Sequence, residues 1–245
     1  MKKRSRVKRL ARFVLRGGRR SLGPAGPLNH PPRYVLFDFD GTLADTFEVG
    51  VAILNILAGE FGFRQLPPEE VAQARDFSTR SLMKHLGIPR MKLPRISQRG
   101  TEEMAKRIDL VRPCAHMPGI VRHLHAAGFR LGILTSNSES NVRAFLKNED
   151  LEIFDFIKSS SKLLGKGSVL RGIMREHRLK PREIFFVGDE LRDIEAAQET
   201  GVHIAAVTWG YNSRAAIEAS APDYLFEHPS EISTLLDGFR QQEEH

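Results

Sequence analysis

Short apolar segments alternate with amphipathic helical segments along most of this 245-residue chain. The predicted strands are residues 33–40, 129–137, 154–160, 183–189, 203–209 and 223–226. The predicted helices between and after them are residues 118–127, 138–147, 165–177, 191–200, 213–219 and 229–238. Continuous apolar strands that alternate with helices indicate a parallel sheet covered on both faces. We therefore predict an α/β fold with a doubly wound, Rossmann-like sheet, whose functional residues lie at the carboxyl ends of the strands.

One long stretch departs from this alternation. Between the first two predicted strands, residues 47–112 show helical periodicity and no clear strand, with an amphipathic segment at 48–62. A stretch of this length is too long for an ordinary crossover between strands. It predicts an inserted helical cap over residues 47–112, placed above the end of the first strand. The α/β core would then consist of residues 33–46 and 113–245.

The positive charge of the chain is concentrated at its beginning. Residues 1–33 contain 11 of the 37 Lys and Arg residues and no acid, so residues 34–245 carry 26 bases against 30 acids, a net charge of −4. The overall basicity is therefore no argument that the folded part binds nucleic acid. We predict that residues 1–32 are a disordered basic arm and linker. The alternatives for residues 1–20 are weak binding of a nucleic acid or an anionic membrane surface, and organellar targeting.

Cysteine content and hydropathy bear on the compartment. The single cysteine, Cys114, excludes an internal disulfide and is predicted to be a small core residue. No apolar run approaches the ~18 residues that a membrane-spanning helix needs. These features predict a cytoplasmic protein, and the sequence gives no sign of an obligate protein partner.

The first predicted strand ends in an unusual way, because the apolar sequence VLF is followed by Asp38 and, two residues later, by Asp40. Strand alternation points residues i and i+2 to the same side, so both carboxylates can face one pocket. Two such acids repel each other unless a cation or a difference in protonation separates them. One nucleophile and one general acid/base held around a metal ion need this arrangement. Asp189 and Thr135 end other predicted strands and should lie on the same edge of the sheet.

Four segments taken in order resemble the motifs of the haloacid dehalogenase superfamily. The segment DFDGTLADT at 38–46 resembles motif I, LGILTSN at 131–137 resembles motif II, Lys166 resembles the motif III lysine, and FFVGDELRD at 185–193 resembles motif IV. The resemblance covers about residues 33–238, and four motifs in order at strand ends are far more specific than any one of them. Within the superfamily the pattern looks most like phosphoglycolate-phosphatase-type members, although sugar phosphomutases share it.

The resemblance implies a role for each motif residue. Asp38 would be the nucleophile, Asp40 the general acid/base, and Lys166 would offset the charge of the phosphoryl group. The phosphoryl oxygens would be bound by Thr135, Ser136 and Thr42, and Thr42 would also support the turn after the first strand. Mg²⁺ would be held by Asp38, by the backbone carbonyl of Asp40 and by Asp189, because oxygen ligands suit this ion. Around these ligands, Glu190 and Asp193 would bind through water or orient Lys166.

The cap would select the substrate. Among its many basic residues, Arg75 and Arg80 are our candidates for binding a substrate carboxylate, because a guanidinium can bind a carboxylate with two parallel hydrogen bonds.

The predicted function is hydrolysis of a small phosphomonoester, for example phosphoglycolate, with Mg²⁺ and an aspartyl-phosphate intermediate. In the superfamily, dehalogenases and phosphonatases lack the second aspartate, so Asp40 indicates phosphate chemistry. The alternative enzymatic readings are a sugar phosphomutase and a pyrophosphatase. A third reading is a protein that binds nucleic acid or a membrane surface through its basic arm.

Overall fold

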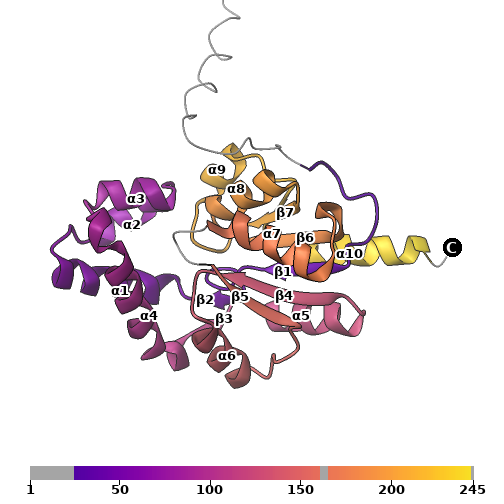
Figure 1. Ribbon diagram of the computed structural model, residues 1–245, viewed down its shortest axis with the longest axis horizontal. Helices are drawn as coiled ribbons and strands as arrows, with labels where there is room; N and C mark the ends of the chain where they lie inside the picture. The colour runs from indigo at the N-terminus through magenta and orange to yellow at the C-terminus, as the bar shows by residue number, and fades with distance from the viewer. Residues whose placement is uncertain (1–24, 161–164, 244–245) are drawn as a thin grey trace, which may run out of the picture.

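The computed structural model describes residues 25–160 and 165–243, so residues 1–24 of the predicted arm and linker at 1–32 lie outside the described part. The centre of the molecule is a six-stranded sheet with strand order β5-β4-β1-β6-β7-β8 (Figure 1). Its strands are β1 (Tyr34–Phe37), β4 (Arg130–Thr135), β5 (Phe156–Ser159), β6 (Ile184–Gly188), β7 (His203–Val207) and β8 (Tyr224–Phe226). All neighbouring strands of this sheet pair in parallel. The prediction of an α/β fold with a parallel sheet is confirmed.

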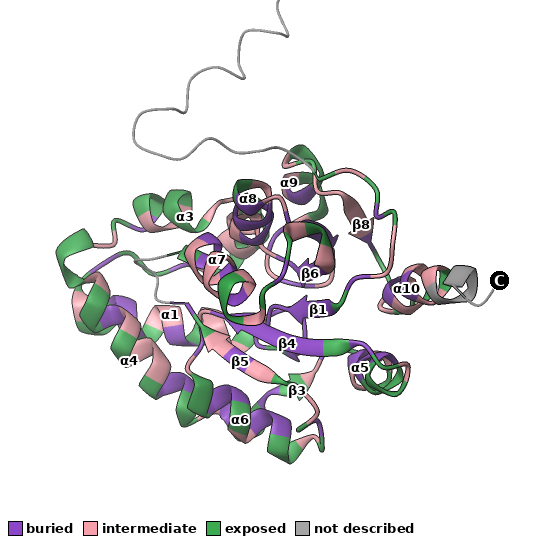
Figure 2. Cartoon of the chain, turned by 45° about the vertical axis from the view of Figure 1, so that its right-hand side comes forward, coloured by how far each residue is buried: buried purple, intermediate pink, exposed green. Residues whose placement is uncertain are grey.

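Two sets of helices cover the two faces of the sheet. Alternate residues of β1 enter different apolar clusters: Val35 and Phe37 join one, and Tyr34 and Leu36 join the other. The first cluster includes side chains of α5 (Met117–Ala126), α6 (Glu139–Asn148) and α10 (Ser230–Glu243). The second includes side chains of α7 (Gly165–His177), α8 (Leu191–Thr200) and α9 (Arg214–Ala219). Figure 2 shows the buried strands between these layers. This arrangement explains why both faces of β1 are apolar.

The long segment after β1 is helical, as its periodicity predicts. It contains α1 (Phe47–Phe61), α2 (Pro68–Ala74), α3 (Thr79–His85) and α4 (Leu93–Ala105), with short 3₁₀ turns at Arg90–Lys92 and Ile108–Leu110. Local sequence explains several of the ends. Gly62 ends α1 in a left-handed conformation with φ of 73°. A proline begins α2, and the Ser78 hydroxyl caps α3 by accepting a hydrogen bond from the Ser81 amide.

Two short strands connect this helical segment to the sheet. They are β2 (Ala44–Asp45) and β3 (Arg112–Pro113), which pair antiparallel with Ala44 opposite Pro113. The chain therefore leaves and re-enters the α/β core at one place, and α1 packs along α4 beyond it (Figure 1). This pairing supports our proposal that the cap spans residues 47–112. We refer to α1–α4 and their connections as the cap.

Part of the predicted linker is packed against the core. The Gly26 amide donates to Asp223, the Leu28 amide donates to the Tyr224 hydroxyl, and the Leu28 side chain is buried. In this short stretch the predicted linker is held against the core, because the apolar Leu28 side chain is buried beside β8. No helix in the part of the chain that the structure describes is long and apolar enough to cross a membrane.

A buried carboxylate stabilises the last cap helix. Glu103 is 5% exposed and accepts hydrogen bonds from Arg99, Lys106 and Arg107. Bonds from Lys106, then Arg107 and Arg99, lower the pKa of Glu103 from 4.5 to about 2. Because the folded-state pKa is depressed, the stabilisation is complete above about pH 4.5 and is lost as the pH falls toward 2.

We therefore expect Glu103→Gln to lower the melting temperature at pH 7 and to weaken its dependence on pH between 4.5 and 2. Thermal melts followed by circular dichroism across this range test the prediction. Glu102→Gln is the matched control, because Glu102 is an exposed neighbour on the same helix. Equal melting curves for wild type and Glu103→Gln at every pH would contradict it.

Candidate active site

The two aspartates of the first motif leave the sheet at the end of β1. Asp38 continues the sheet, because its amide donates to the Val187 carbonyl, and its side chain is buried. Phe39 points into the apolar core, where its ring packs edge-on against Phe145 at 5.1 Å between ring centroids. Asp40 lies half-buried and lines a large cavity. This alternation follows directly from strand geometry.

A buried lysine joins two of the acidic motifs. The Lys166 Nζ lies 2.5 Å from Asp38 Oδ2 and 2.5 Å from Asp193 Oδ1, and all three side chains are at most 2% exposed. Burial alone would lower the pKa of Lys166, but the carboxylates of Asp193 and Asp38 raise it, so the ammonium stays charged. Lys166 lies in the first turn of α7, and Asp193 lies in the first turn of α8. The packing of these two helices therefore places the cation against the end of β1.

Asp189 follows β6 and lies beside Asp38. Its carboxylate accepts hydrogen bonds from the Thr42 hydroxyl at 2.6 Å and from the Tyr211 amide at 2.7 Å. The hydroxyl of Thr42 thus reaches across to Asp189, whereas we had placed it within the turn or against the phosphoryl group. Gly41 has φ of 78°, and a Cβ atom there would overlap the Asp189 carboxylate. A glycine is therefore required at this close approach of backbone and carboxylate.

The carboxylates form a site that suits a divalent cation. One oxygen from each of Asp38, Asp189 and Asp193 lies within 4.8 Å of the others. Burial, then repulsion from Asp38, Glu190 and Asp193, raises the pKa of Asp189 well above its usual range. The raised pKa means that the nearby positive charge does not balance these buried carboxylates. A bound divalent cation would supply the missing positive charge. The oxygen donors fit a hard cation such as Mg²⁺.

The acids of this cluster differ in how free they are to bind a metal. Both carboxylate oxygens of Asp193 already accept hydrogen bonds, one from Lys166 and one from the Glu190 amide. Burial, opposed by Lys166, raises the pKa of Asp193 to about 6. These contacts support our interpretation that Asp193 orients Lys166. The side chain of Glu190 is directed elsewhere, because it pairs with Arg192 and accepts a bond from Thr79.

The end of β4 supplies hydroxyl and amide groups. Thr135 is fully buried, and its hydroxyl accepts a hydrogen bond from the Asn137 amide. Ser136 lines the cavity. Asn137 donates from Nδ2 to the Asp40 carboxylate at 3.1 Å. Burial raises the pKa of Asp40 although this hydrogen bond opposes the shift, and a raised pKa favours a carboxyl group that gives up a proton during the reaction.

Asn137 and Arg192, which we had not selected from the sequence, also lie at this edge of the sheet. Asn137 orients Asp40, and Arg192 places a guanidinium beside Ser136, to which it donates a hydrogen bond at 3.1 Å. Burial disfavours the charge of Arg192, but Glu190, Asp38 and Asp193 outweigh this effect and raise its pKa. Both residues lie inside the motif segments, so the sequence could have indicated that they are near the site. A single sequence does not reveal where their side chains point.

A loop of the core holds the cap. Asn212 donates to the carbonyls of Arg75 and Phe77 and accepts from the Leu191 amide. The Tyr211 hydroxyl donates to the Thr46 carbonyl, and its ring packs against Phe47. The loop at 210–213 therefore joins α8 and Asp189 to the beginning of the cap and to the end of α2.

The two arginines proposed for substrate binding have different positions. Arg75 lines the cavity, stacks over the Phe47 ring at 4.7 Å and donates to the Gly210 carbonyl. Arg80 is not among the described residues that line this cavity, and its charge acts on Glu195 of α8. Arg75 therefore stays our candidate for a substrate contact, whereas Arg80 lies away from the residues described as lining the cavity.

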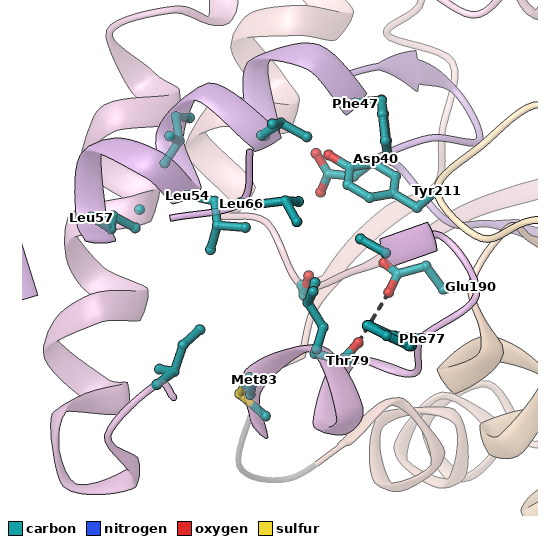
Figure 3. Close-up of a pocket in the computed structure, with 18 of the residues that line it drawn as sticks. Asp40, Phe47, Leu54, Leu57, Leu66, Phe77, Thr79, Met83, Glu190 and Tyr211 are labelled. Atoms are coloured by element: carbon teal, nitrogen blue, oxygen red, sulfur yellow. Dashed lines mark hydrogen bonds between the residues drawn. The ribbon is translucent and has the colours of Figure 1, made fainter. Parts of the chain in front are cut away.

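A cavity of about 340 Å³ lies between the cap and this edge of the sheet (Figure 3). Asp40, Ser136, Asn137, Glu190 and Arg192 line its end at the core. In Figure 3 the Asp40 carboxylate and the Tyr211 ring lie near Phe47, and Leu54, Leu57 and Met83 surround the space farther into the cap. The reactive edge of the sheet therefore opens into a chamber whose far walls are built by the cap.

Comparisons with known proteins identify the class of protein, a hydrolase that acts on phosphate esters. The chain belongs to the haloacid dehalogenase-like hydrolase family, which it matches over residues 35–207. It is 33% identical to a phosphoglycolate phosphatase of Synechococcus elongatus over 209 residues, covering 85% of this chain and 99% of that protein. It is also 27% identical over 220 residues to the pyrophosphatase PpaX of Bacillus cereus, covering 84% of this chain and 97% of that protein.

The fold has a counterpart among solved structures. A haloacid dehalogenase-like family hydrolase from Streptococcus pneumoniae superimposes with a TM-score of 0.70 at 24% identity, covering 83% of this chain and 97% of that one. The family membership predicted from the motifs is confirmed.

Proposed function

We propose that this protein is a Mg²⁺-dependent phosphomonoesterase that works through an aspartyl-phosphate at Asp38. The observation that carries the proposal is the arrangement of Asp38, Asp189 and Lys166 on one buried edge, with Asp40 at the entrance to the chamber. Phosphoglycolate is the first substrate to test, because it appears in the name of the relative from Synechococcus elongatus.

Each residue of the site has a separate role in the proposed two-step reaction. The Asp38 carboxylate attacks phosphorus and forms an acyl phosphate, while Asp40 gives its proton to the departing alkoxide. Water then attacks the phosphorus of the acyl phosphate, Asp40 removes a proton from this water, and Asp38 is released with inorganic phosphate. Lys166 and Arg192 stabilise negative charge on the phosphoryl oxygens, and Thr135 and Ser136 bind these oxygens. Mg²⁺, held by Asp38, Asp189 and the carbonyl of Asp40, would offset the charge on phosphate and nucleophile.

The role of Asp40 gives a sharp test of this proposal. Wild type should release phosphate from alkyl phosphomonoesters only with Mg²⁺. Asp40→Asn should slow alkyl esters by about 10²–10⁴-fold, which is the usual contribution of a general acid. With p-nitrophenyl phosphate the loss in kcat/KM should be much smaller, because this leaving group departs without a proton and kcat/KM does not include the later hydrolysis of the acyl phosphate. The value of kcat/KM for phosphate release from both esters, measured with and without EDTA, tests the prediction. An equal loss of kcat/KM on both esters would contradict the role of Asp40 as general acid, and no release by wild type from any ester would contradict the function.

A further inference from the structure

The chamber above the reactive edge has two chemically different ends. Its core end carries the polar and charged groups described above. Its cap end is lined by apolar side chains from α1, α3, α4 and their connections: Leu54, Leu57, Leu66, Met83, Ile96 and Met104. A volume of about 340 Å³ lies within the ~300–1,000 Å³ of small-molecule sites. A group that enters the chamber from the phosphoryl site therefore meets a predominantly apolar wall.

The positive charge in the chamber stays at its core end. Among the described residues that line it, the basic side chains are Arg75 and Arg192. Arg192 is paired with Glu190, and Arg75 is bonded to the Gly210 carbonyl and stacked on Phe47. A carboxylate placed farther into the cap would lose its hydration without gaining a cation there, which is strongly unfavourable. The deep part of the chamber is therefore unsuited to an anionic leaving group.

We infer that the substrate is a phosphomonoester whose alcohol carries an apolar group several carbons long, and that this group occupies the cap end of the chamber. The inference rests on the proposed phosphatase function and narrows its substrate. Phosphoglycolate has a short, charged alcohol portion, so it would leave the apolar end of the chamber filled with water. An alkyl or aryl group would remove that apolar surface from water, which is favourable in proportion to the buried area.

A series of n-alkyl phosphates tests the inference in wild type. We expect kcat/KM to rise roughly fourfold for each methylene from ethyl to hexyl phosphate, since a buried methylene contributes about 0.8 kcal/mol. Hexyl phosphate should also be a better substrate than phosphoglycolate. Activity that is flat along the series, or highest with phosphoglycolate, would overturn the inference but leave the phosphatase function intact. Absence of release from every ester with Mg²⁺ would overturn both.

Two glycines of the cap provide matched variants. Gly100 lies on α4 and lines the chamber, where a Cβ atom would meet only Leu57 Cδ1 at 3.5 Å. Gly59 lies on α1, is exposed, and has nothing within 4 Å of its Cβ position. Replacing a helical glycine by leucine favours the helix in both cases. The two substitutions therefore add the same side chain inside and outside the chamber.

We expect Gly100→Leu to reduce the ratio of kcat/KM for hexyl over ethyl phosphate by at least tenfold, because the new side chain occupies the space of the alkyl group. Gly59→Leu should keep the wild-type ratio. Circular dichroism melts of both variants establish that they are folded. An unchanged ratio in a folded Gly100→Leu protein would overturn the inference.

Discussion

Replacing Asp38 with asparagine is expected to abolish phosphate release, with a loss of at least about 10⁴-fold in kcat, as for other enzymes that lose a nucleophile. The carboxamide keeps an acceptor for the Phe39 amide, which bonds Asp38 Oδ1 at 2.7 Å. It also removes a negative charge from a crowded acidic site, since burial already raises the pKa of Asp38 despite Lys166. The variant gives up the contact of Asp38 with Lys166, but Lys166 keeps its ion pair with Asp193, so the variant should still fold. Circular dichroism establishes that it is folded, and its loss of activity should then be chemical in origin.

Loss of activity by itself does not separate a nucleophile from a metal ligand. Acid-quenched mixtures of wild type with substrate and Mg²⁺ should show a protein mass increased by one phosphoryl group, located by peptide mapping at Asp38. Asp38→Asn should show none. Asp45→Asn is the matched control, because Asp45 is an exposed aspartate on β2, and it should retain both activity and labelling. Labelling of Asp38→Asn at another residue would contradict the proposed intermediate.

Replacing Lys166 with methionine should be the most damaging change to stability. The substitution leaves the carboxylates of Asp38 and Asp193 buried without their shared cation. Breaking a buried ion pair from one side costs about 3–5 kcal/mol of unfolding free energy. The same change removes positive charge from the phosphoryl site, so activity should fall by at least about 10²-fold. Urea unfolding in the presence of EDTA, at pH 7.5, measures the first effect.

The pH dependence identifies the cause of this instability. Burial raises the pKa of Asp193 from 3.8 to about 6 in the folded protein. A carboxyl group with a raised folded-state pKa binds more protons when folded than when unfolded, so its contribution to stability improves as the pH falls from 6 toward 3.8. Without Lys166 this pKa should rise further, and the deficit of Lys166→Met should shrink as the pH is lowered from 7.5 to 5.

A surface lysine and a second substitution provide the controls. Lys158 forms an ion pair with Glu176 in which both side chains are partly exposed, so Lys158→Met should cost less than about 1 kcal/mol. Adding Asp193→Asn to Lys166→Met should restore part of the lost stability, because it removes one of the uncompensated charges. A cost below about 1 kcal/mol for Lys166→Met would contradict the buried ion-pair assignment.

Much of the fold can be predicted from this sequence because local patterns and tertiary packing agree. The apolar segment that becomes β1 is continuous because both of its faces are covered, and the period of 3.6 in the cap matches helices with one buried side. The motif acids could be placed on one edge because the carboxyl ends of parallel strands coincide. For the same reason, Asp38 and Asp189 meet although 150 residues separate them along the chain.

Side-chain direction could not be predicted in the same way. Arg192 and Asn137 lie within recognisable segments, but only the packing of α8 and β4 directs one at Ser136 and the other at Asp40. Arg75 directly follows α2 and Arg80 lies at the beginning of α3, and in the sequence both are basic residues near the connection of these helices. The docking of the loop at 210–213 places Arg75 at the chamber.

The sequence by itself determined the class of fold and the order of the strands and helices along the chain, because periodicity and short motifs are local properties. For the same reason it predicted the residues that we propose to carry the chemistry. Only the tertiary structure decided the shape and polarity of the chamber. Its walls come from Leu54, Met83 and Met104, on three separate helices, and nothing in the spacing of these residues indicates that they face one cavity. A cavity is a property of how helices pack against each other, and its volume depends on distances that no local pattern contains.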